Sequence, residues 1–471
     1  MKDNKLLHVS KVLSQIELRR FEKYLRYRTD NAVLLALFEE IKAHYPTLDS
    51  DDFEREKIWE RLFPGKPFNM PQLRYAFSDL TILVEDFLVQ QTALEQQAPY
   101  YTTLKKWYRS KNLDKYYQQT QASELELIEK NGVHDSHYFL SRFQFFEEQY
   151  QYLLEKRNRN NELDLNDVLQ DLDKYFLTTK LKHACEIVNR ANILKTPFPD
   201  ALKADLLEYL SLKQYENIPA VGNYYLILET LLEPDVTEHY NRLKEQLSLT
   251  SSEFSKEEMR DLYGYAQNYC IRKINGGDLG YLNELLDLYK ALLDSGVIFE
   301  NGYLSHSDFK NIVFVSLRLR EFQWCYDFIE QSKSLLNPAQ RKNAYTYNLA
   351  YYYFFIGDFK KSLTLLNQIS FTDIFYFLDS RSLLLKNFYE LDEIDPLLSL
   401  IDSFRSNLKR NKEISEYQRT IYLNLVKYVN QLLKKEYRNA TKIAALQKEI
   451  EENKQVADKT WLLQKVAELM S

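Results

Sequence analysis

The chain has few residues that interrupt regular secondary structure. Its 471 residues include 10 glycines and 11 prolines, whereas an average protein contains about 7% glycine and about 5% proline. Sandwiches, barrels and doubly wound sheets need many turns that contain these residues. Their scarcity therefore argues against a sheet protein. Aromatic residues make up 14% of the chain, which excludes an intrinsically disordered protein. We expect a folded, nearly all-helical chain.

Cysteine is also scarce. Cys185, Cys270 and Cys325 lie too far apart in the sequence for a zinc knuckle or a redox pair. No cluster of basic residues adjoins Cys185 or Cys325 to lower the pKa of the thiol, so we interpret both as buried thiols rather than nucleophiles. Few, unpaired thiols in apolar surroundings are typical of a reducing compartment.

The chain also lacks a large net charge and long apolar runs. The net charge is −6 and the pI is about 5.8, which gives no general attraction to nucleic acid or to an anionic membrane. The longest apolar run, Leu349–Ile356, is far shorter than the roughly 18 residues that a bilayer span requires. The first residues of the chain lack the apolar core of a signal peptide. These features predict a cytoplasmic protein that does not enter a membrane.

Proline-rich and polar stretches divide the chain. Pro99 follows the first group of amphipathic segments, and the polar stretch at 248–252 precedes another. Both are typical of connections between helical regions. The predicted regions are an N-terminal helical bundle at 1–97, a helical middle region at 98–252, helical repeats at 253–435 and C-terminal helices at 436–471.

A short pattern recurs in the second half of the chain. Asn268, Asn311, Asn348 and Asn424 are each followed by two apolar residues, and Leu383 has the matching phase without an asparagine. The spacings are 43, 37, 35 and 41 residues. A period of this length, with two helices in each copy, is typical of an α-solenoid. The predicted fold class is therefore all-α, an α-α superhelix with an N-terminal helical bundle.

One copy of this pattern, Asn348–Ile369, resembles a tetratricopeptide (TPR) repeat. Gly357 stands where that family has its turn glycine, which permits a tight turn. In the two neighbouring copies Arg320 and Leu391 stand at that position, and the resemblance covers about residues 300–430. The other matching residues of the best copy are Leu349, Ala350, Tyr353, Phe359, Ser362 and Leu363. The resemblance implies a TPR-like solenoid.

A second resemblance covers most of the chain. The segments FPGKPFNMPQLRYAFSDL, DLDKYFLTTKLKHACEIVNR and LKRNKEISEYQRTIYLNLVKYV look like parts of an uncharacterised family of bacterial helical-repeat proteins. That family implies the helical-repeat architecture and no activity.

No residue pattern in the sequence is typical of catalysis, a cofactor or a metal. Gly65–Pro67 lacks the Ser or Thr of a phosphate loop, and Gly276–Gly280 lacks the dinucleotide-binding spacing. His134 and His137, with Asp135, have a spacing that can hold a metal, but Asp and Ser at a helix start are ordinary caps, and we favour that interpretation. We predict that the protein is not an enzyme and needs no cofactor.

The predicted function is a scaffold for protein–protein interaction. In TPR domains that bind acidic chain ends, an Asn of the first helix bonds the peptide, and Lys or Arg on the same face hold its carboxylates. By this resemblance Asn348 occupies the position of that Asn, and Asn311 and Asn268 are further candidates. The partner would be a peptide or a protein.

The neighbours of these asparagines predict an aromatic groove. One of them is charged, which argues against a carboxylate clamp and favours a partner with apolar anchors. The alternative is that the protein's own earlier helices fill the groove, because so apolar a face is costly to leave wet. The solvent exposure of Tyr347, Tyr351 and Phe354, which neighbour Asn348 on its helix, distinguishes an open groove from a filled one. The predicted groove residues beside the asparagines are Lys310, Phe314, Tyr347, Tyr351 and Phe354.

A weaker candidate is a basic face near the C-terminus. Five basic residues have spacings that place them on one side of a single helix. Such a face could bind an acidic partner, and the alternative is a solvated surface balanced by acidic neighbours. These residues are Lys427, Lys434, Lys435, Arg438 and Lys442.

A rival function is a transcriptional regulator that reads DNA. The segment at 55–90 looks like a helix-turn-helix that precedes a repeat domain. Its second helix carries Arg74 against three acidic residues, Asp79, Glu85 and Asp86. A helix that contacts DNA is expected to have the opposite balance, so charge argues against this function.

The last residues predict a capping helix. Trp461, Leu462, Val466 and Leu469 form one apolar stripe within 458–470. A solenoid exposes core at its open end, and this stripe could close it. We therefore expect Trp461 to be buried.

The helical composition leads to a direct test. Far-ultraviolet circular dichroism of the protein is expected to give at least about 65% helix, compared with the roughly 30–35% of an average domain. A strand content above about 15% would contradict the all-α fold, since an average domain has about 20–25%.

Overall fold

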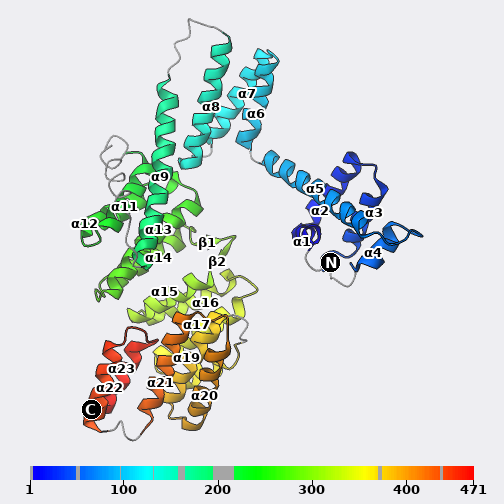
Figure 1. Cartoon of the computed structure of the whole chain (residues 1–471). Helices are drawn as coiled ribbons and strands as arrows, with labels where there is room; N and C mark the ends of the chain where they lie inside the picture. The colour runs from blue at the N-terminus through cyan, green and yellow to red at the C-terminus, as the bar shows by residue number, and fades with distance from the viewer. Residues whose placement is uncertain are drawn as a thin grey trace. The chain divides into compact units, whose positions relative to one another are not determined.

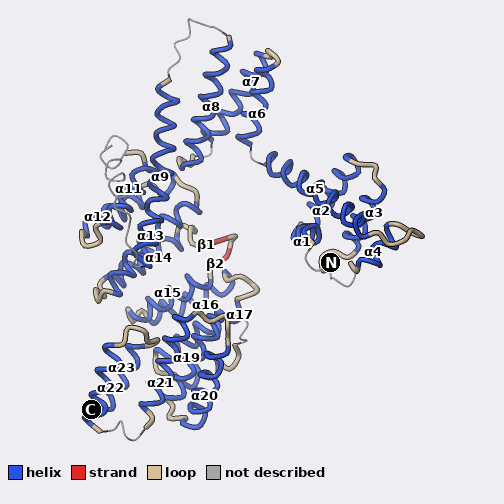
Figure 2. Tube along the Cα trace, viewed as in Figure 1, coloured by secondary structure: helices blue, strands red, loops and turns tan. Residues whose placement is uncertain are grey.

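A computed structural model of the chain describes residues 4–48, 53–95, 97–130, 132–156, 165–194, 217–369, 374–434 and 439–470. The structure is 79% helical, with 22 α-helices in these ranges (Figure 2). A short antiparallel hairpin, β1 (Phe299–Glu300) with β2 (Tyr303–Leu304), is the one β-sheet among them. The prediction of an all-α protein is confirmed. No helix in the described ranges has the length and apolar character needed to cross a membrane.

Contacts divide the chain into two units, 1–179 and 180–471, and the boundary lies inside helix α9 (Asn166–Leu194). This division into two units does not test the four regions predicted from the sequence, so their boundaries stay predictions.

The first five helices form a bundle around the longest of them. In Figure 1, α1 to α4 surround α5, and each packs against it. The bundle has its own core, in which Phe21, Leu37 and Leu80 are fully buried. The bounds are α1 (Lys5–Val12), α2 (Gln15–Arg28), α3 (Ala32–Ala43), α4 (Arg55–Leu62) and α5 (Met70–Glu95).

The start of α2 shows how the sequence sets a helix boundary. The Ser14 hydroxyl accepts a hydrogen bond from the Glu17 N–H at 3.2 Å, and the Glu17 carboxylate accepts one from the Ser14 N–H at 2.6 Å. This reciprocal capping box satisfies two N–H groups that no helix carbonyl can reach.

The rest of the first unit consists of α6 (Gln97–Ser110), α7 (Asp114–Lys130), α8 (Ser136–Glu155) and the start of α9. Helices α6, α7 and α8 pack against one another. Their interior holds an ion pair between Lys105 and Glu124, 2.5 Å apart and closed to solvent on both sides. Burial lowers the pKa of Lys105, although Glu124 acts in the opposite direction. A buried charge is tolerated when it is paired.

The second unit is a succession of helical hairpins. From α11 to α21 each helix packs against the next. First helices of neighbouring hairpins also touch: α11 contacts α13, and α15, α17, α19 and α21 contact one another in turn (Figure 1). We call α11, α13, α15, α17, α19 and α21 the first helices. The hairpins are α11 (Pro219–Leu232) with α12 (Thr237–Leu249), α13 (Lys256–Asn275) with α14 (Tyr281–Asp294), α15 (His306–Arg318) with α16 (Phe322–Ser332), α17 (Arg341–Phe355) with α18 (Phe359–Leu366), and α19 (Ile374–Glu390) with α20 (Ile394–Arg410). They are followed by α21 (Glu416–Leu432), α22 (Ala440–Glu452) and α23 (Lys459–Met470).

The same turn ends four of the first helices. At each, a residue with positive φ donates its N–H three residues back, and the next residue donates five residues back, as in a Schellman motif. The residues with positive φ are Gly277, Arg320, Gly357 and Asp392. Each lies nine residues after one of the repeat positions 268, 311, 348 and 383. The repeat phase therefore corresponds to a recurring hairpin.

Two stretches of the repeat, 313–320 and the turn near Leu391, were ambiguous in the sequence. The stretch 313–320 alternates in polarity as a strand would, but it lies in and just after helix α15, which is the position that the phase of the repeat assigns to a helix. In the copy that contains Leu383, the residue with positive φ is Asp392, one position after the expected Leu391. The predicted position was wrong by one residue, because this copy has no glycine to mark the turn.

The C-terminal helix α23 packs on α21 and α22. Leu462 and Val466 are fully buried, as the apolar stripe predicted. Trp461 is only half-buried, and its indole N–H donates to Glu390 at 2.7 Å. The expectation of a buried Trp461 was therefore wrong. Lys465 is buried instead, and it pairs with Glu390 at 2.8 Å.

The recurring turn allows a prediction with opposite signs at two equivalent positions. Gly357 has φ +85°, and nothing lies within 4 Å of the Cβ that a substitution would add. Gly357→Ala should therefore lower the free energy of unfolding through backbone strain alone, by about 1 kcal/mol. Arg320→Gly, at φ +62°, should raise the free energy of unfolding, because glycine relieves the backbone strain at this position. The gain should be smaller than the loss in Gly357→Ala, because glycine also has more freedom in the unfolded chain.

Urea denaturation of the full chain, followed by circular dichroism, measures both variants. If Gly357→Ala were stabilising or Arg320→Gly strongly destabilising, backbone strain at the residue with positive φ would not govern the stability of the hairpin.

Candidate binding face of the helical repeats

The predicted aromatic groove residues lie on α15 and α17. Phe314 is 42% exposed and stacks on Tyr351, with 6.3 Å between ring centroids. Tyr351 and Phe354 are half-buried, and Asn311 is exposed. The structure thus brings Phe314 and Tyr351 together from neighbouring first helices on a surface that solvent reaches.

Two of the predicted residues are not accessible. Asn348 is 0% exposed, and its amide donates to the Ala344 carbonyl of its own helix at 2.8 Å. Tyr347 is 5% exposed and packs edge-on against Tyr376 of α19, at 5.5 Å between centroids. The expectation that both line an open groove was wrong, because α19 packs closely on this side of α17. Since Tyr351 and Phe354 stay half-exposed, the face is covered only in part.

Two basic residues of this face, Lys310 and Lys386, have acidic partners within the chain. Lys310 pairs with Asp379 of α19, which also accepts a hydrogen bond from the Tyr422 hydroxyl at 2.9 Å. Lys386 lies 2.6 Å from Asp458, in the segment that leads into α23. The covering elements are therefore α19 and the segment that leads into α23, and not the earlier helices that the sequence suggested.

Asp458 is held by two residues of α19. Lys386 and the Ser382 hydroxyl each donate to its carboxylate. Burial alone would raise the pKa of Asp458, but the charge of Lys386 and these hydrogen bonds outweigh it, so its pKa lies below the ordinary value. The ionised carboxylate thus ties α23 to the inner side of α19.

The basic face near the C-terminus is not one helix face. Lys427 belongs to α21 and pairs with Glu449 at 2.6 Å, whereas Lys442 belongs to α22. Lys434 is exposed beyond the end of α21, and Lys435 and Arg438 lie outside the described residues. The helix that the spacing required ends at Leu432, so the prediction of a single stripe was wrong.

The described residues contain no group of three or more His, Cys, Asp or Glu side chains arranged for a metal. Asp135 caps α8 by accepting from the Tyr138 N–H at 3.0 Å, as expected. The three cysteines are free and buried. Burial raises the pKa of Cys270 and of Cys325 to about 11, so neither is a thiolate near neutral pH.

The helices at 55–90 do not have the geometry of a helix-turn-helix. Seven residues, Phe63–Asn69, separate α4 from α5, whereas that motif has a turn of about 3–4 residues. The exposed side of α5 presents Arg74 together with Asp79 and Asp86. This balance of charge offers little attraction to a phosphate backbone.

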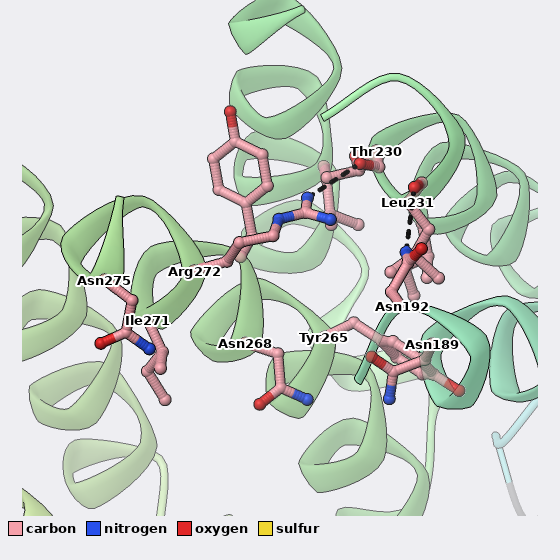
Figure 3. A pocket seen from close by; sticks show the side chains of 12 residues that line it. Asn189, Asn192, Thr230, Leu231, Tyr265, Asn268, Ile271, Arg272 and Asn275 are labelled. Atoms are coloured by element: carbon pink, nitrogen blue, oxygen red, sulfur yellow. Dashed lines mark hydrogen bonds between the residues drawn. The ribbon is translucent and has the colours of Figure 1, made fainter. Parts of the chain in front are cut away.

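A pocket that the sequence did not indicate lies between α9, α11 and α13. It has a volume of about 400 Å³ (Figure 3), and a second pocket of about 490 Å³ shares Asn189, Tyr265 and Asn268 with it. Of its residues only Asn268 was singled out from the sequence, through the repeat. Helix α9 carries no such repeat position, so no pattern in the sequence indicated that Asn189 and Asn192 line the pocket.

Polar side chains in the pocket bond to the end of α11. Asn192 donates to the Leu231 carbonyl at 3.3 Å, and Arg272 donates to the Thr230 carbonyl at 3.4 Å (Figure 3). The last carbonyls of a helix have no partner within it, so these side chains supply one. Elsewhere in the pocket, three asparagines have no hydrogen-bond partner among the described side chains and backbone: Asn189, Asn268 and Asn275.

Comparison with known proteins adds no relative. The chain matches no protein-family model, no curated protein and no solved structure. The resemblance to TPR repeats therefore depends on the residues of the repeat and on the hairpins that they form.

The Asp458 contact predicts how α23 is held. In Asp458→Asn the pair with Lys386 loses its charge, and the amide hydrogens of α23 should exchange at least about tenfold faster at pH 7, because a hydrogen bond to a charged group contributes about 1.5–3 kcal/mol. Hydrogen exchange with mass spectrometry measures this. Since the folded pKa of Asp458 lies below its unfolded value, its stabilisation is present above about pH 4 and is lost as the pH falls further.

Asp402→Asn is the matched control. Asp402 is 81% exposed and pairs with Arg405 at 3.4 Å on α20, and such a surface pair contributes about 0–1 kcal/mol. Unchanged exchange of α23 in Asp458→Asn would mean that apolar packing and the contacts of Trp461 and Lys465 with Glu390 hold the helix without the Asp458 contact.

Proposed function

We propose that the chain is a non-enzymatic scaffold for protein–protein interaction, a TPR-like α-α superhelix that binds a peptide or protein partner along its first helices. The recurring hairpins and their turns support the superhelix. The pocket between α9, α11 and α13 supports the binding of an extended peptide. The aromatic residues on α15 and α17 would provide apolar anchors further along the same partner.

The unpartnered asparagines are the observation that carries this proposal. Each asparagine amide has a carbonyl that accepts and an NH2 group that donates hydrogen bonds. A peptide backbone offers the complementary groups at every residue. Asn189, Asn268 and Asn275 lie on two helices around one pocket, so an extended chain crossing it could bond to more than one of them.

In this proposal the protein acts in the cytoplasm, without a cofactor. The three free and buried cysteines support a reducing location. The acidic net charge and the exposed acids of α5 favour a protein partner over nucleic acid.

Replacement of Asn268 tests the proposal. Fluorescein-labelled pools of random octapeptides ending in leucine should bind the full chain, as followed by fluorescence anisotropy. Asn268→Ala should weaken binding about three- to tenfold, because a neutral hydrogen bond contributes about 0.5–1.5 kcal/mol. Asn268 is exposed, so the variant is expected to fold.

Asn283→Ala is the control, since Asn283 is an exposed asparagine on α14, the second helix of the same hairpin. If no pool binds the unchanged protein, or if both variants bind like it, the proposal is wrong.

A further inference from the structure

The segment that joins α22 to α23, residues 453–458, lies against helix α21. The side-chain amide of Asn424 donates a hydrogen bond to the Gln455 carbonyl at 2.8 Å. The Ala457 N–H donates one to the Ile421 carbonyl at 3.2 Å. Helix α21 therefore holds this segment through backbone groups, which a peptide of any sequence also offers.

Asp458, the last residue of the segment, lies beside helix α19. Its carboxylate accepts hydrogen bonds from Lys386 and Ser382 of that helix. The same Lys386 ammonium lies 5.9 Å from the ring centroid of Tyr351 and 5.2 Å from that of Phe354, both on α17. Asp458 and these two aromatic rings therefore share one basic neighbour.

Electrostatic effects connect Asp458 with two further first helices. Burial would raise the pKa of Asp458, but Lys386 and, more weakly, Lys310 of α15 lower it. Burial and Asp379 raise the pKa of Tyr422 on α21, and the charge of Asp458 adds to this effect. Four first helices, α15, α17, α19 and α21, thus carry side chains close to one acidic residue of the C-terminal segment.

The backbone of Asp458 is strained. Its φ is +50°, in the left-handed region that residues other than glycine seldom adopt. Aspartate tolerates this region better than most residues, but such a conformation persists only where the surroundings fix it. Here the fixing contacts are those of the carboxylate with Lys386 and Ser382. Their loss would let the backbone relax, so the strain favours release of the segment.

Apolar packing contributes little to the position of the segment. None of the residues 453–458 is fully buried, and Lys454 and Gln455 are exposed. Helix α23, which follows, differs in that Leu462 and Val466 are completely buried. Departure of the segment from α19 and α21 therefore costs mainly polar contacts, which water replaces in part, and little apolar area.

The aromatic residues beside Asp458 remain partly open to solvent. Tyr351 and Phe354 are half-buried, and Phe314, which stacks on Tyr351, is 42% exposed. We call Phe314, Tyr351 and Phe354 the aromatic face. A partner that covered these rings would also meet Lys386 and Asp458, so the segment and the partner would compete for the same space.

We infer that residues 453–458 are an internal competitor of the partner: the segment occupies the first helices beside the aromatic face, and the partner binds this face fully only when the segment leaves. The inference rests on the proposed scaffold function and names how its aromatic face is regulated. Hydrogen bonds and one ion pair hold the segment, and the strain at Asp458 opposes them. The alternative is a permanent cap of the last repeat, and the two differ in whether a free copy of the segment can bind.

A free copy of the segment is therefore the first test. The probe is a fluorescein-labelled peptide with the sequence of residues 451–460, capped at both ends, and fluorescence anisotropy follows its binding to the full chain. In the unchanged protein the tethered segment has an effective concentration of about 1 mM and should exclude the probe. Asp458→Asn removes the charged contact of the tethered segment, so the probe should bind this variant at least about tenfold more tightly.

A second variant changes the segment at another contact. Ala457→Pro removes the N–H that bonds to the Ile421 carbonyl and leaves the first helices unchanged. It should bind the probe about three- to tenfold more tightly than the unchanged protein does, because the tethered segment loses one neutral hydrogen bond. Asp402→Asn, the surface variant on α20, is the control and should bind the probe like the unchanged protein.

A change in the probe identifies its contact. A probe with Asn at the position of Asp458 should bind the Asp458→Asn protein at least about tenfold more weakly than the original probe does. Adding Lys386→Gln should remove this difference, because the carboxylate then has no basic partner. Should that double variant unfold, as shown by circular dichroism, the comparison of the two probes on Asp458→Asn still decides the inference.

The random octapeptides that test the proposed function also test the competition. The apparent affinity for a partner is reduced to the fraction of molecules whose site is open. Asp458→Asn should therefore bind the octapeptides at least about threefold more tightly than the unchanged protein does, and Asp402→Asn should not.

The outcomes separate the inference from the proposed function. If the probe binds Asp458→Asn no better than the unchanged protein, or binds neither, the segment is a permanent cap and the inference is wrong. If the octapeptides bind both proteins equally, the segment does not compete with a partner, and the inference is again wrong while peptide binding stands. If the octapeptides bind no form of the protein, the proposed function fails, and the inference fails with it.

Discussion

A pair of amphipathic helices cannot bury its apolar residues alone, and this constraint organises the second half of the chain. Helix α20, for example, buries one stripe at helical spacing and exposes the rest: Leu397, Leu400, Ile401, Phe404 and Leu408. One partner helix covers only part of such a stripe, so each hairpin must pack against the next. The left-handed residue after four of the first helices makes the return short enough for this stacking, whether that residue is Gly357 or Arg320.

Stacking of the first helices creates a second constraint, because polar groups are drawn into their contacts. The structure satisfies most of them internally. Lys386 is paired with Asp458, and Asn348 bonds to its own helix. The same principle operates in the first unit, where Lys105 is buried with Glu124. Against this background the amides of Asn189, Asn268 and Asn275 differ, since they line a pocket and bond to no other described residue, which leaves them open to a ligand.

The candidate site was predictable only where the repeat reached it. Asn268 was indicated by its phase, which is a local property of the sequence. Arg272 follows it by one helical turn, but its hydrogen bond to the Thr230 carbonyl depends on where α11 ends. Asn189 belongs to α9, which carries no copy of the repeat. Conversely, Asn348 has the best local match and is buried, because its burial is decided by the neighbouring helix α19.

The sequence by itself determined the helical fold, the period of the hairpins, the capping of α2 and α8 and the burial of the thiols. These follow from the spacing of apolar residues and from short-range hydrogen bonds, which act within a few residues. Tertiary structure decided which side chains of the first helices remain open, that Asp458 returns to α19, and that Trp461 stays half-buried. The last two outcomes depend on contacts between residues more than 70 positions apart, and the first depends on a neighbouring helix, as Tyr347 does on Tyr376 of α19. The periodicity of a single helix carries no information about either.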